Sequence, residues 1–299
     1  MEETQNQEIK EIKNFHDKYY KLLLLIPAAI LIFSIIYMVN FYNHNNDFIY
    51  KDISLTGGTT ITLYEKLDVS KLKQDLSDKL NDLNIRKIYD IITREQKAVI
   101  IETKTSGDET KQILEDYLGY DLNDENSSFE FTGSTLSESF YNQLLIAILV
   151  AFILMAIVVF IIFRTFVPSA AVILSAFADI LMTITLVNIF GMRMSSAGIV
   201  AFLMLIGYSV DTDILLTTRI LKRKEGSLNE RIIGAFKTGI TMTLTSLLAI
   251  LFALLVVKSF SPILSQIFTI LSIGLFFDIF NTWITNVSIL KWYVEKKHG

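Results

Sequence analysis

The sequence predicts a membrane protein with a bundle of six transmembrane helices and one α+β domain outside the bilayer, between helices 1 and 2. The chain is 52% hydrophobic, which exceeds the average for soluble domains. It contains six apolar runs, each near the roughly 20 helical residues that cross the ~30 Å hydrocarbon core of a bilayer. Its charges gather elsewhere: 19 of the 31 acidic and 11 of the 27 basic residues lie between Asn40 and Glu138.

The apolar runs give the expected spans, and the basic residues around them give the orientation. The spans lie at about Leu22–Val39, Leu144–Phe163, Val167–Val187, Ala197–Thr217, Ala235–Val257 and Ile263–Leu290. Fourteen basic residues flank the spans on one side: Lys10, Lys13, Lys18, Lys21, Arg164, Arg219, Lys222, Arg223, Lys224, Arg231, Lys237, Lys291, Lys296 and Lys297. Only Arg193 and Lys258 mark the short loops opposite. The positive-inside rule therefore predicts that both termini are cytoplasmic.

This orientation divides the chain into five segments. We expect a cytoplasmic N-terminal segment at 1–21, transmembrane helix 1 at 22–39, an extracytoplasmic domain at 40–138, transmembrane helices 2–6 at 139–290, and a cytoplasmic tail at 291–299. A long segment crosses the membrane regardless of its own charge, so the acidic domain does not conflict with this topology.

The segment 40–138 has the pattern of a small α+β domain. The stretch ISLTGGTTITLYE after Asp52 predicts a strand interrupted by Gly57 and Gly58. Next we expect a helix at Val69–Leu83 capped by Asp68 or Ser70, strands at Ile85–Thr93 and Ala98–Thr103, a helix at Glu109–Leu118 and a strand at Ser128–Thr132. The order β-α-β-β-α-β is typical of a ferredoxin-like fold.

Several classes of function are disfavoured. The chain has no cysteine, and its three histidines lie outside the apolar runs, so we expect neither a metal centre nor a cofactor. The net charge of −4 disfavours nucleic-acid binding. The motif Thr56-Gly57-Gly58 could cradle a phosphate, but no lysine or helix start follows it at once, so close backbone packing is the favoured interpretation. No catalytic constellation is present, and we do not expect an enzyme.

Four aspartates lie within the predicted spans: Asp179, Asp211, Asp213 and Asp278. Each aspartate raises the free energy of inserting its helix into the membrane by roughly 2.5–3.5 kcal/mol when it lies near the helix centre. We therefore expect them to face the bundle interior, a water-filled cavity or a partner subunit. They are the candidate residues for ion or proton coupling.

Helical geometry separates two of these aspartates. Asp211 and Asp213 are two residues apart, which places them about 200° apart around the helix. Gly207 and Thr218 share the face of Asp211, whereas Ser209 and Thr217 share that of Asp213. Further polar residues of span five lie at a comparable depth: Thr241, Thr243, Thr245 and Ser246. The aspartates either bond to threonines, cap a broken helix or pair with Arg219, or they take up and release protons.

The loop LKRKEGSLNER between spans four and five is strongly basic. Anchoring of the topology and contact with anionic membrane lipid are the favoured roles. Docking to a ribosome or a channel remains an alternative.

Four features resemble the SecF family of protein-export proteins, within the resistance-nodulation-division superfamily. LTGGTTI is similar to the segment that opens the family's external domain, and IGYSVDTDILLTTRI resembles its span-four motif. TGITMTLTSLLAILFALL resembles its fifth span, and the Ser261–Gln266 segment and Gly274 stand where that family has its last span. Asp211-Thr212-Asp213 stands in place of the bacterial Asn-Asp-Thr, and this Asp-x-Asp form resembles the archaeal branch. Thr218 stands in place of the family's usual acidic residue before the retained Arg219.

This resemblance implies half of a resistance-nodulation-division architecture and an accessory role in the Sec translocon. The chain would act with SecD beside a SecYE-type channel, contact the translocating polypeptide, and use the membrane ion gradient. Two other functions stay open: a half-size efflux transporter of small apolar molecules, and a passive scaffold for SecD.

Overall fold

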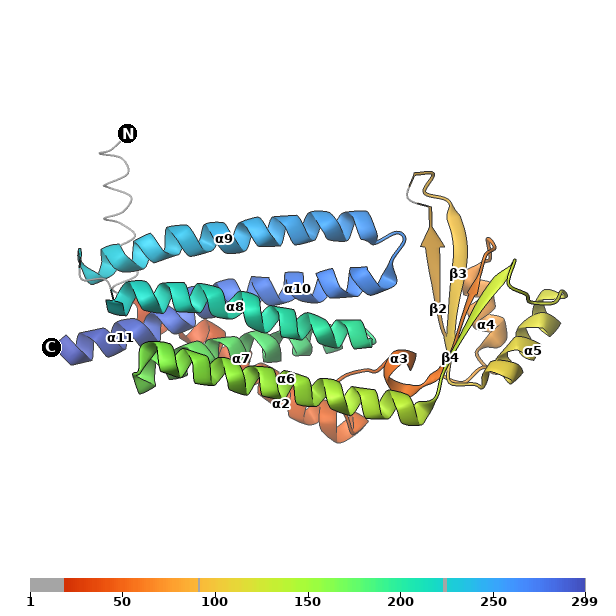
Figure 1. Ribbon diagram of the computed structural model, residues 1–299, viewed down its shortest axis with the longest axis horizontal. Helices are drawn as coiled ribbons and strands as arrows, with labels where there is room; N and C mark the ends of the chain where they lie inside the picture. Colours follow the sequence, from red (N-terminus) through yellow and green to blue (C-terminus); the bar gives the residue numbers. More distant parts are fainter. Residues whose placement is uncertain (1–18, 91, 223–224, 299) are drawn as a thin grey trace.

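The computed structural model describes residues 19–90, 92–222 and 225–298, and it consists of a long helical bundle with a small sheet domain at one end (Figure 1). The far end of the bundle, opposite the sheet domain, carries the end of α8, the start of α9, the α6–α7 turn and α11 (Figure 1). The predicted segment 1–21 lies almost wholly outside the described residues, as do Arg223 and Lys224.

Six helices of the described chain are long and apolar enough to cross a membrane. All six predicted spans are found, and each helix extends beyond its predicted run. The helices are α2 (Leu25–Asn45, within a span that begins at Tyr19), α6 (Ser134–Phe163), α7 (Phe166–Ile189), α8 (Ser196–Lys222), α9 (Leu228–Val257) and α10 (Pro262–Phe280). The last span continues as a π-helix, η1 (Asn281–Asn286), and then as α11 (Val287–His298).

Local sequence signals set the ends of these helices. Ser227 caps α9, because its hydroxyl accepts a bond from the backbone N–H of Glu230 while that glutamate bonds back to the backbone of Ser227. The Ser261 hydroxyl caps α10 by accepting from the Leu264 N–H, with Pro262 at the first helical position, where no N–H is needed. Arg164 ends α6 in the left-handed conformation, with φ 53°.

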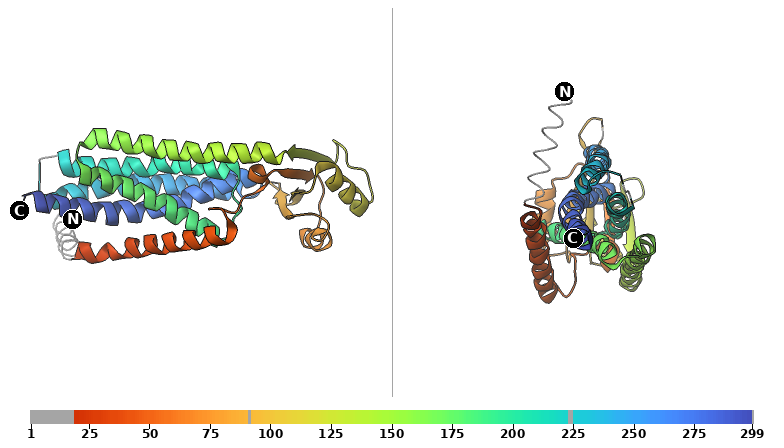
Figure 2. Two further views of the ribbon diagram at one scale, coloured as in Figure 1. Left: turned by 90° about the horizontal axis from the view of Figure 1, so that it is seen from below. Right: turned by 90° about the vertical axis from the view of Figure 1, so that its left-hand side faces the viewer.

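The bundle has a buried centre and an exposed periphery. In α7 and α8, 56% of the most apolar window is buried, against 17% in α2, 6% in α6 and 17% in α9. The α10 helix packs against α7, α8 and α9, and Figure 2 shows the helices running side by side along the long axis of the molecule. Polar residues on α7, α8 and the last span are therefore the ones that the bundle can shelter.

The sheet domain contains the six elements expected from the sequence, in the expected order. They are β1 (Gly58–Leu63), α4 (Val69–Leu76), β2 (Asn84–Tyr89), β3 (Gln96–Thr103), α5 (Gly107–Leu118) and β4 (Ser127–Thr132). The strands form one antiparallel sheet in the order β2-β3-β1-β4, with Ile61 paired to Ile101 and to Phe129. Ile61, Leu72 and Leu114 form its core with other apolar residues.

Three predicted boundaries in this domain are wrong. Residues Ile53–Thr56 form a short helix, α3, and not the first part of a strand, because the Asp52 carboxylate caps it by accepting a bond from the Ser54 N–H (2.9 Å). The helix α4 ends at Leu76 and not at Leu83. The strand β2 ends at Tyr89 because the Asp90 carboxylate accepts bonds from the backbone of the following turn.

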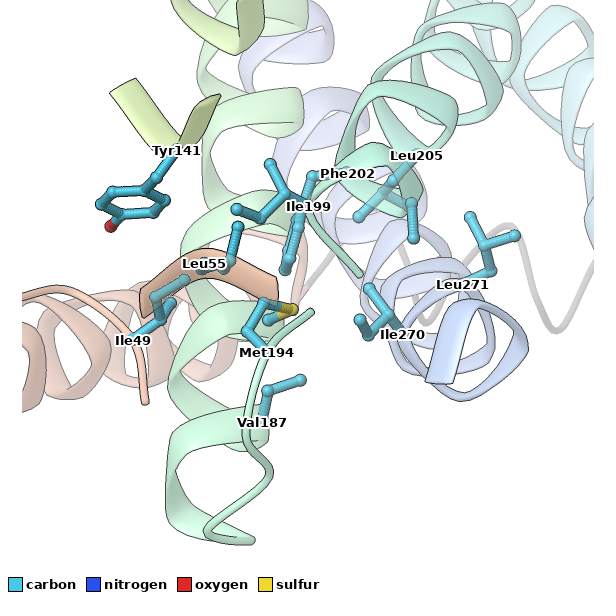
Figure 3. Packing of buried hydrophobic residues seen from close by; sticks show 11 residues of the cluster. Ile49, Leu55, Tyr141, Val187, Met194, Ile199, Phe202, Leu205, Ile270 and Leu271 are labelled. Atoms are coloured by element: carbon cyan, nitrogen blue, oxygen red, sulfur yellow. The ribbon is translucent and has the colours of Figure 1, made fainter. Parts of the chain in front are cut away.

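The sheet domain is joined to the bundle through a hydrophobic cluster and a short backbone bridge. Figure 3 shows Leu55 of α3 packed beside Met194 of the α7–α8 turn and Ile199 of α8. The Asp52 N–H donates to the Met194 carbonyl (3.0 Å), and the Met194 N–H donates to the Tyr50 carbonyl (2.6 Å). The α7–α8 turn and the chain entering the domain therefore form one packed junction.

Polar contacts at two places tie the sheet domain to other loops at the same end of the bundle. Asp82 pairs with Arg193 of the α7–α8 turn (2.5 Å) and with Lys104 (3.0 Å). At the tip of the β2–β3 hairpin, the Arg94 guanidinium donates to the Ser259 hydroxyl (2.7 Å), and the Tyr89 N–H donates to the Ser259 carbonyl (2.9 Å). The hairpin thus rests on the loop that joins α9 to α10.

Candidate functional site

Three carboxyl groups meet inside the bundle, one from each of its most buried helices. Asp179 lies on α7, Asp213 on α8 and Asp278 on α10, and each has an exposed fraction of 0%. Each bonds to a residue of the same short segment of the last span: Asp179 to Asn281, Asp278 to Thr282 and Asp213 to Asn286. At about 1.5 Å per residue, Asp213 and Asp278 lie about 24–26 Å along their helices from the domain end, and Asp179 about 20 Å from the far end. We call these three residues the carboxylate cluster.

Asp179 is held by one hydroxyl and one amide. The Ser209 hydroxyl of α8 donates to Asp179 Oδ2 (2.5 Å), and Asn281 of η1 donates from Nδ2 to Asp179 Oδ1 (2.7 Å). Both partners are buried. This carboxyl group therefore links α7, α8 and the last span at a single point.

The other two carboxyl groups join α8 to the last span. Asn286 donates from Nδ2 to Asp213 Oδ1 (2.7 Å). Asp278 accepts from the Thr212 hydroxyl at Oδ2 (3.2 Å) and from the Thr282 hydroxyl at Oδ1 (3.1 Å). Every donor in these contacts is an amide or a hydroxyl, so the contacts hold the carboxyl groups without neutralising their charge.

The π-helix η1 supplies several of these partners. Asn281, Thr282, Trp283 and Asn286 are all buried. A π-helical turn is wider than an α-helical one and is frequent at functional sites. Sequence reasoning missed η1, although the polar stretch NTWITN inside an otherwise apolar run was a visible signal. It also missed Asn281 and Asn286 as partners of the aspartates.

Gly239 of α9 leaves the space that the π-helix needs for its tryptophan. A Cβ atom added at Gly239 would lie 2.8 Å from Trp283 Cη2 and closer still to Trp283 Cζ2. The Phe236 ring meets the indole edge-on, with ring centroids 5.1 Å apart. The α9 helix therefore packs against η1, with the Trp283 indole seated over Gly239 and beside Phe236.

Among the described residues, no ion pair involves a member of the carboxylate cluster. Arg219, the nearby arginine proposed as a partner, donates instead to the Gly234 carbonyl (2.5 Å) and the Thr238 hydroxyl (2.9 Å) of α9. The expected pairing with Arg219 is therefore wrong, whereas the expected bonding to threonines is found at Asp278. Several polar atoms around the cluster are buried without a hydrogen-bond partner in the described chain: Asp213 Oδ2, Asn286 Oδ1, Ser175 Oγ and Thr217 Oγ1.

Asp211 does not belong to the cluster. It is exposed on the outer face of α8, as is Gly207 one turn before it, where an added Cβ would meet nothing within 4 Å. Asp211 and Asp213 therefore point in different directions, as their helical spacing requires. The exposed face also includes Met204 (41% exposed) and Tyr208 (41%).

The polar residues of α9 are not brought to the cluster by hydrogen bonds. Thr241 and Thr245 are exposed, and their hydroxyls donate to backbone carbonyls of their own helix. Thr243 is buried, and Ser246 is half-buried. The sequence placed these residues at a depth comparable to that of the aspartates, but the partners of the carboxylate cluster come instead from α8 and the last span.

The Thr56-Gly57-Gly58 motif serves close packing. A Cβ atom at Gly57, where φ is 80°, would lie 2.5 Å from Ser134 Cα, and one at Gly58 would collide with the Thr103 carbonyl oxygen. Thr56 donates from its hydroxyl to the Asp52 carbonyl (3.1 Å). Within the described ranges, no group of three His, Cys, Asp or Glu side chains is placed to hold a metal ion.

Comparison with known proteins connects this arrangement to one family. Residues 112–296 match the family described as protein export membrane protein SecD/SecF, C-terminal. The chain belongs to this family. Curated relatives from the SecD/SecF family include the protein-export membrane protein SecF of Methanocaldococcus jannaschii, 42% identical over 93% of this chain and 97% of that protein. SecF of Methanothermobacter thermautotrophicus is 39% identical over 93% and 94%.

Solved structures of SecDF share the fold. The crystal structure of SecDF from Thermus thermophilus, titled a translocon-associated membrane protein, superposes with a TM-score of 0.66 at 19% identity. A SecDF structure in the super-membrane-facing form gives a TM-score of 0.60, also at 19% identity. This chain is covered to 94% in both, but it spans only 38% and 39% of those longer chains. This member of the SecD/SecF family is thus a multi-pass membrane protein whose fold matches part of SecDF.

Proposed function

We propose that the chain is an accessory subunit of the Sec protein-export translocon, and that it acts with SecD to couple the membrane ion gradient to polypeptide translocation. The family and the named relatives support the export role. The solved SecDF chains are longer than this one and contain a region of matching fold. In that arrangement SecD supplies the part that this chain lacks.

We also propose that the sheet domain is ferredoxin-like and extracytoplasmic, and that both termini are cytoplasmic. The element order and the antiparallel strand order β2-β3-β1-β4 support the fold. The distribution of basic residues along the chain supports the orientation. The domain would then stand where an emerging polypeptide leaves a SecYE-type channel.

The carboxylate cluster is the single observation that carries the coupling proposal. A carboxylate inside a bilayer is costly, and functional pathways are where such groups are retained. Asp179, Asp213 and Asp278 are fully buried, and their described partners are neutral amides and hydroxyls. No ion pair within the described chain neutralises these groups, and an uncompensated carboxylate is unfavourable inside a bilayer. We therefore infer that protons accompany them, and that the arrival or departure of a proton changes the hydrogen bonds between α8 and η1.

An ion entering from one side of the membrane gains energy from the potential. One elementary charge moving through 100 mV corresponds to about 2.3 kcal/mol. The contacts that the cluster controls are few, and each net hydrogen bond contributes about 1 kcal/mol. The ion gradient is therefore large enough to bias how the last span packs against α8.

The Asp211 face of α8 is the proposed contact with SecD. Asp211 lies at membrane depth on an exposed face, and facing lipid it would cost about 2.5–3.5 kcal/mol. The small residue Gly207 beside it allows another helix to approach closely. A SecD helix that offers a polar group to Asp211 removes this cost.

The proposal is tested by single substitutions that remove charge and keep shape. Asp179→Asn, Asp213→Asn and Asp278→Asn should each lower gradient-dependent translocation into inverted vesicles that contain SecD and the channel. In the Asp213→Asn variant, the new amide oxygen can still accept the bond from Asn286, so the fold should persist. Thr241→Val, on the exposed side of α9, is the matched control and should leave translocation unchanged.

The same experiment separates a transducer from a passive scaffold for SecD. If all three variants translocate at the normal rate, retain their response to the gradient and copurify normally with SecD, the scaffold function stands and the coupling proposal is wrong. If the purified chain carries no SecD or channel subunits from its native membrane, the export role itself is wrong, and the efflux alternative gains support.

A further inference from the structure

A cavity at the far end of the bundle is lined by cationic and apolar side chains. It has a volume of about 260 Å³ and lies between the end of α6, the start of α7, the end of α8 and α11. Its cationic lining residues are Lys222, Arg231 and Lys297. No acidic side chain is among its described lining residues, whereas the neighbouring cavity around Arg219 also contains Glu225 and Glu230.

The polar groups of this cavity are oriented by their surroundings. Arg231 donates from Nη1 to the Ile220 carbonyl (2.7 Å), which holds its guanidinium at the end of α8. Lys222 lies over the Phe163 ring, with Nζ 6.0 Å from the ring centroid, and Lys297 lies over Tyr293 at 5.9 Å. Neither lysine forms an ion pair within the described chain.

A buried hydroxyl adds a second, independent sign of a ligand. Thr165 lines the cavity, and its Oγ1 is buried without a hydrogen-bond partner among the described residues. Thr165 is also the N-cap residue of the 24-residue helix α7, yet its side chain makes no capping bond. The hydroxyl and the positive end of α7 thus stand at a cavity that three cationic side chains also line.

Together, the charge and the apolar surroundings favour a lipid as the occupant. Phe166, the residue after Thr165, is 78% exposed, and Ile161 in the last turn of α6 is 60% exposed. Both lie close along the chain to the lining residues Phe163 and Thr165, so exposed apolar side chains for an acyl chain stand within a few residues of the cavity. Basic pockets between transmembrane helices at a membrane interface bind anionic lipid headgroups.

We propose that this cavity is a binding site for an anionic phospholipid, whose headgroup phosphate is held by Lys222, Arg231, Lys297 and Thr165. The phosphate accepts hydrogen bonds from the charged groups and from the Thr165 hydroxyl, which thereby gains a partner. The acyl chains run along the exposed apolar side of α6. An inorganic phosphate shares the headgroup chemistry but gains nothing from that apolar surface.

The test compares two double variants that remove equal charge. The full chain is purified with its partner in mild detergent, stripped of lipid, and offered phosphatidylglycerol or phosphatidylcholine. Retained lipid is counted by native mass spectrometry. Lys222→Gln/Lys297→Gln should retain about tenfold less phosphatidylglycerol than the unaltered chain. The matched control Arg164→Gln/Lys296→Gln changes exposed far-end residues that do not line the cavity, and should retain it normally.

Two further measurements complete the test. Thr165→Val, which keeps the shape and removes the hydroxyl, should also lower retention of phosphatidylglycerol. Inorganic phosphate, offered alone in excess, should not displace the bound lipid. Three results would each overturn the proposal: an equal loss of phosphatidylglycerol from both double variants, retention of phosphatidylcholine equal to that of phosphatidylglycerol, or displacement of the bound lipid by inorganic phosphate. The first points to general surface charge, the second to an apolar groove, and the third to a soluble anion.

Discussion

Replacing Gly239 with alanine tests how firmly α9 braces the π-helix. The added methyl group would overlap the six-membered ring of the Trp283 indole, 2.8 Å from Cη2. Overpacking of this kind costs about 1–3 kcal/mol, and alanine in place of a helical glycine returns about 0.5–1 kcal/mol. We expect a net loss of about 1–2 kcal/mol in the free energy of unfolding.

Trp283→Phe should relieve the collision, because phenylalanine lacks the ring atoms that the methyl group meets. Alone, this change loses buried apolar surface and should cost on the order of 1–2 kcal/mol. The double variant should be less destabilised than the sum of the single variants, by about 1 kcal/mol or more. Residues without coupling add within about 0.3–0.5 kcal/mol, so the difference is measurable.

Unfolding is followed by far-UV circular dichroism in mild detergent with increasing SDS, since the loss of a tryptophan would confuse fluorescence. Gly207→Ala is the matched control, because an added Cβ at that exposed position meets nothing within 4 Å. It should leave the stability of the isolated chain unchanged or raise it by up to about 1 kcal/mol. Additive single effects, or a Gly239→Ala variant as stable as the control, would refute the bracing argument.

Three further predictions concern the sheet domain and one helix start. Partial burial acts to raise the pKa of Asp82, but the bonds of its carboxylate to Lys104 and Arg193 outweigh burial and lower that pKa. The ionised carboxylate therefore stabilises the folded domain at pH values above the pKa that Asp82 has in the unfolded chain. At pH 7, Asp82→Asn should therefore have a free energy of unfolding lower than that of the unaltered chain by up to about 1 kcal/mol. This difference should vanish as the pH falls below about 3.9 and through the lowered pKa of Asp82. A difference in stability that persists at low pH contradicts the prediction. Gly58→Ala should prevent correct folding of the domain, seen as protease sensitivity, since φ is 145° there; a protease-resistant variant would be unexpected. Ser227→Ala should cost about 1 kcal/mol of stability by removing the cap of α9, and an unchanged melting curve would show that this cap is dispensable.

The fold was largely predictable because apolar runs and alternating patterns report burial directly. The six spans and the order of the six domain elements follow from them. The short helix at Ile53–Thr56 was not predictable in this way, since its β-branched and alternating residues favour a strand. Its conformation depends on the Asp52 cap and on Leu55 packing into the bundle, and both are features of tertiary structure.

The candidate site was only partly predictable. Charge in an apolar run identified Asp179, Asp213 and Asp278, and the spacing of Asp211 and Asp213 implied opposite faces. Their partners could not be foreseen, because a pattern search that assumes 3.6 residues per turn puts the polar residues of NTWITN on mistaken faces. The threonines of α9 had the right depth, but depth along a helix does not say which way a side chain points.

The π-helix has a consequence for the end of the chain. A segment of this kind holds one residue more than an α-helix of the same length. If η1 tightened into an α-helix, everything after Asn286 would turn by about 100° and slide by about 1.5 Å. Tyr293 and Lys297 lie on the part of α11 that would turn, and both line the far-end cavity. If release of the proton proposed for the carboxylate cluster drove this tightening, it would swing these two side chains away from the proposed lipid headgroup, and a tightly held headgroup would in turn resist the tightening.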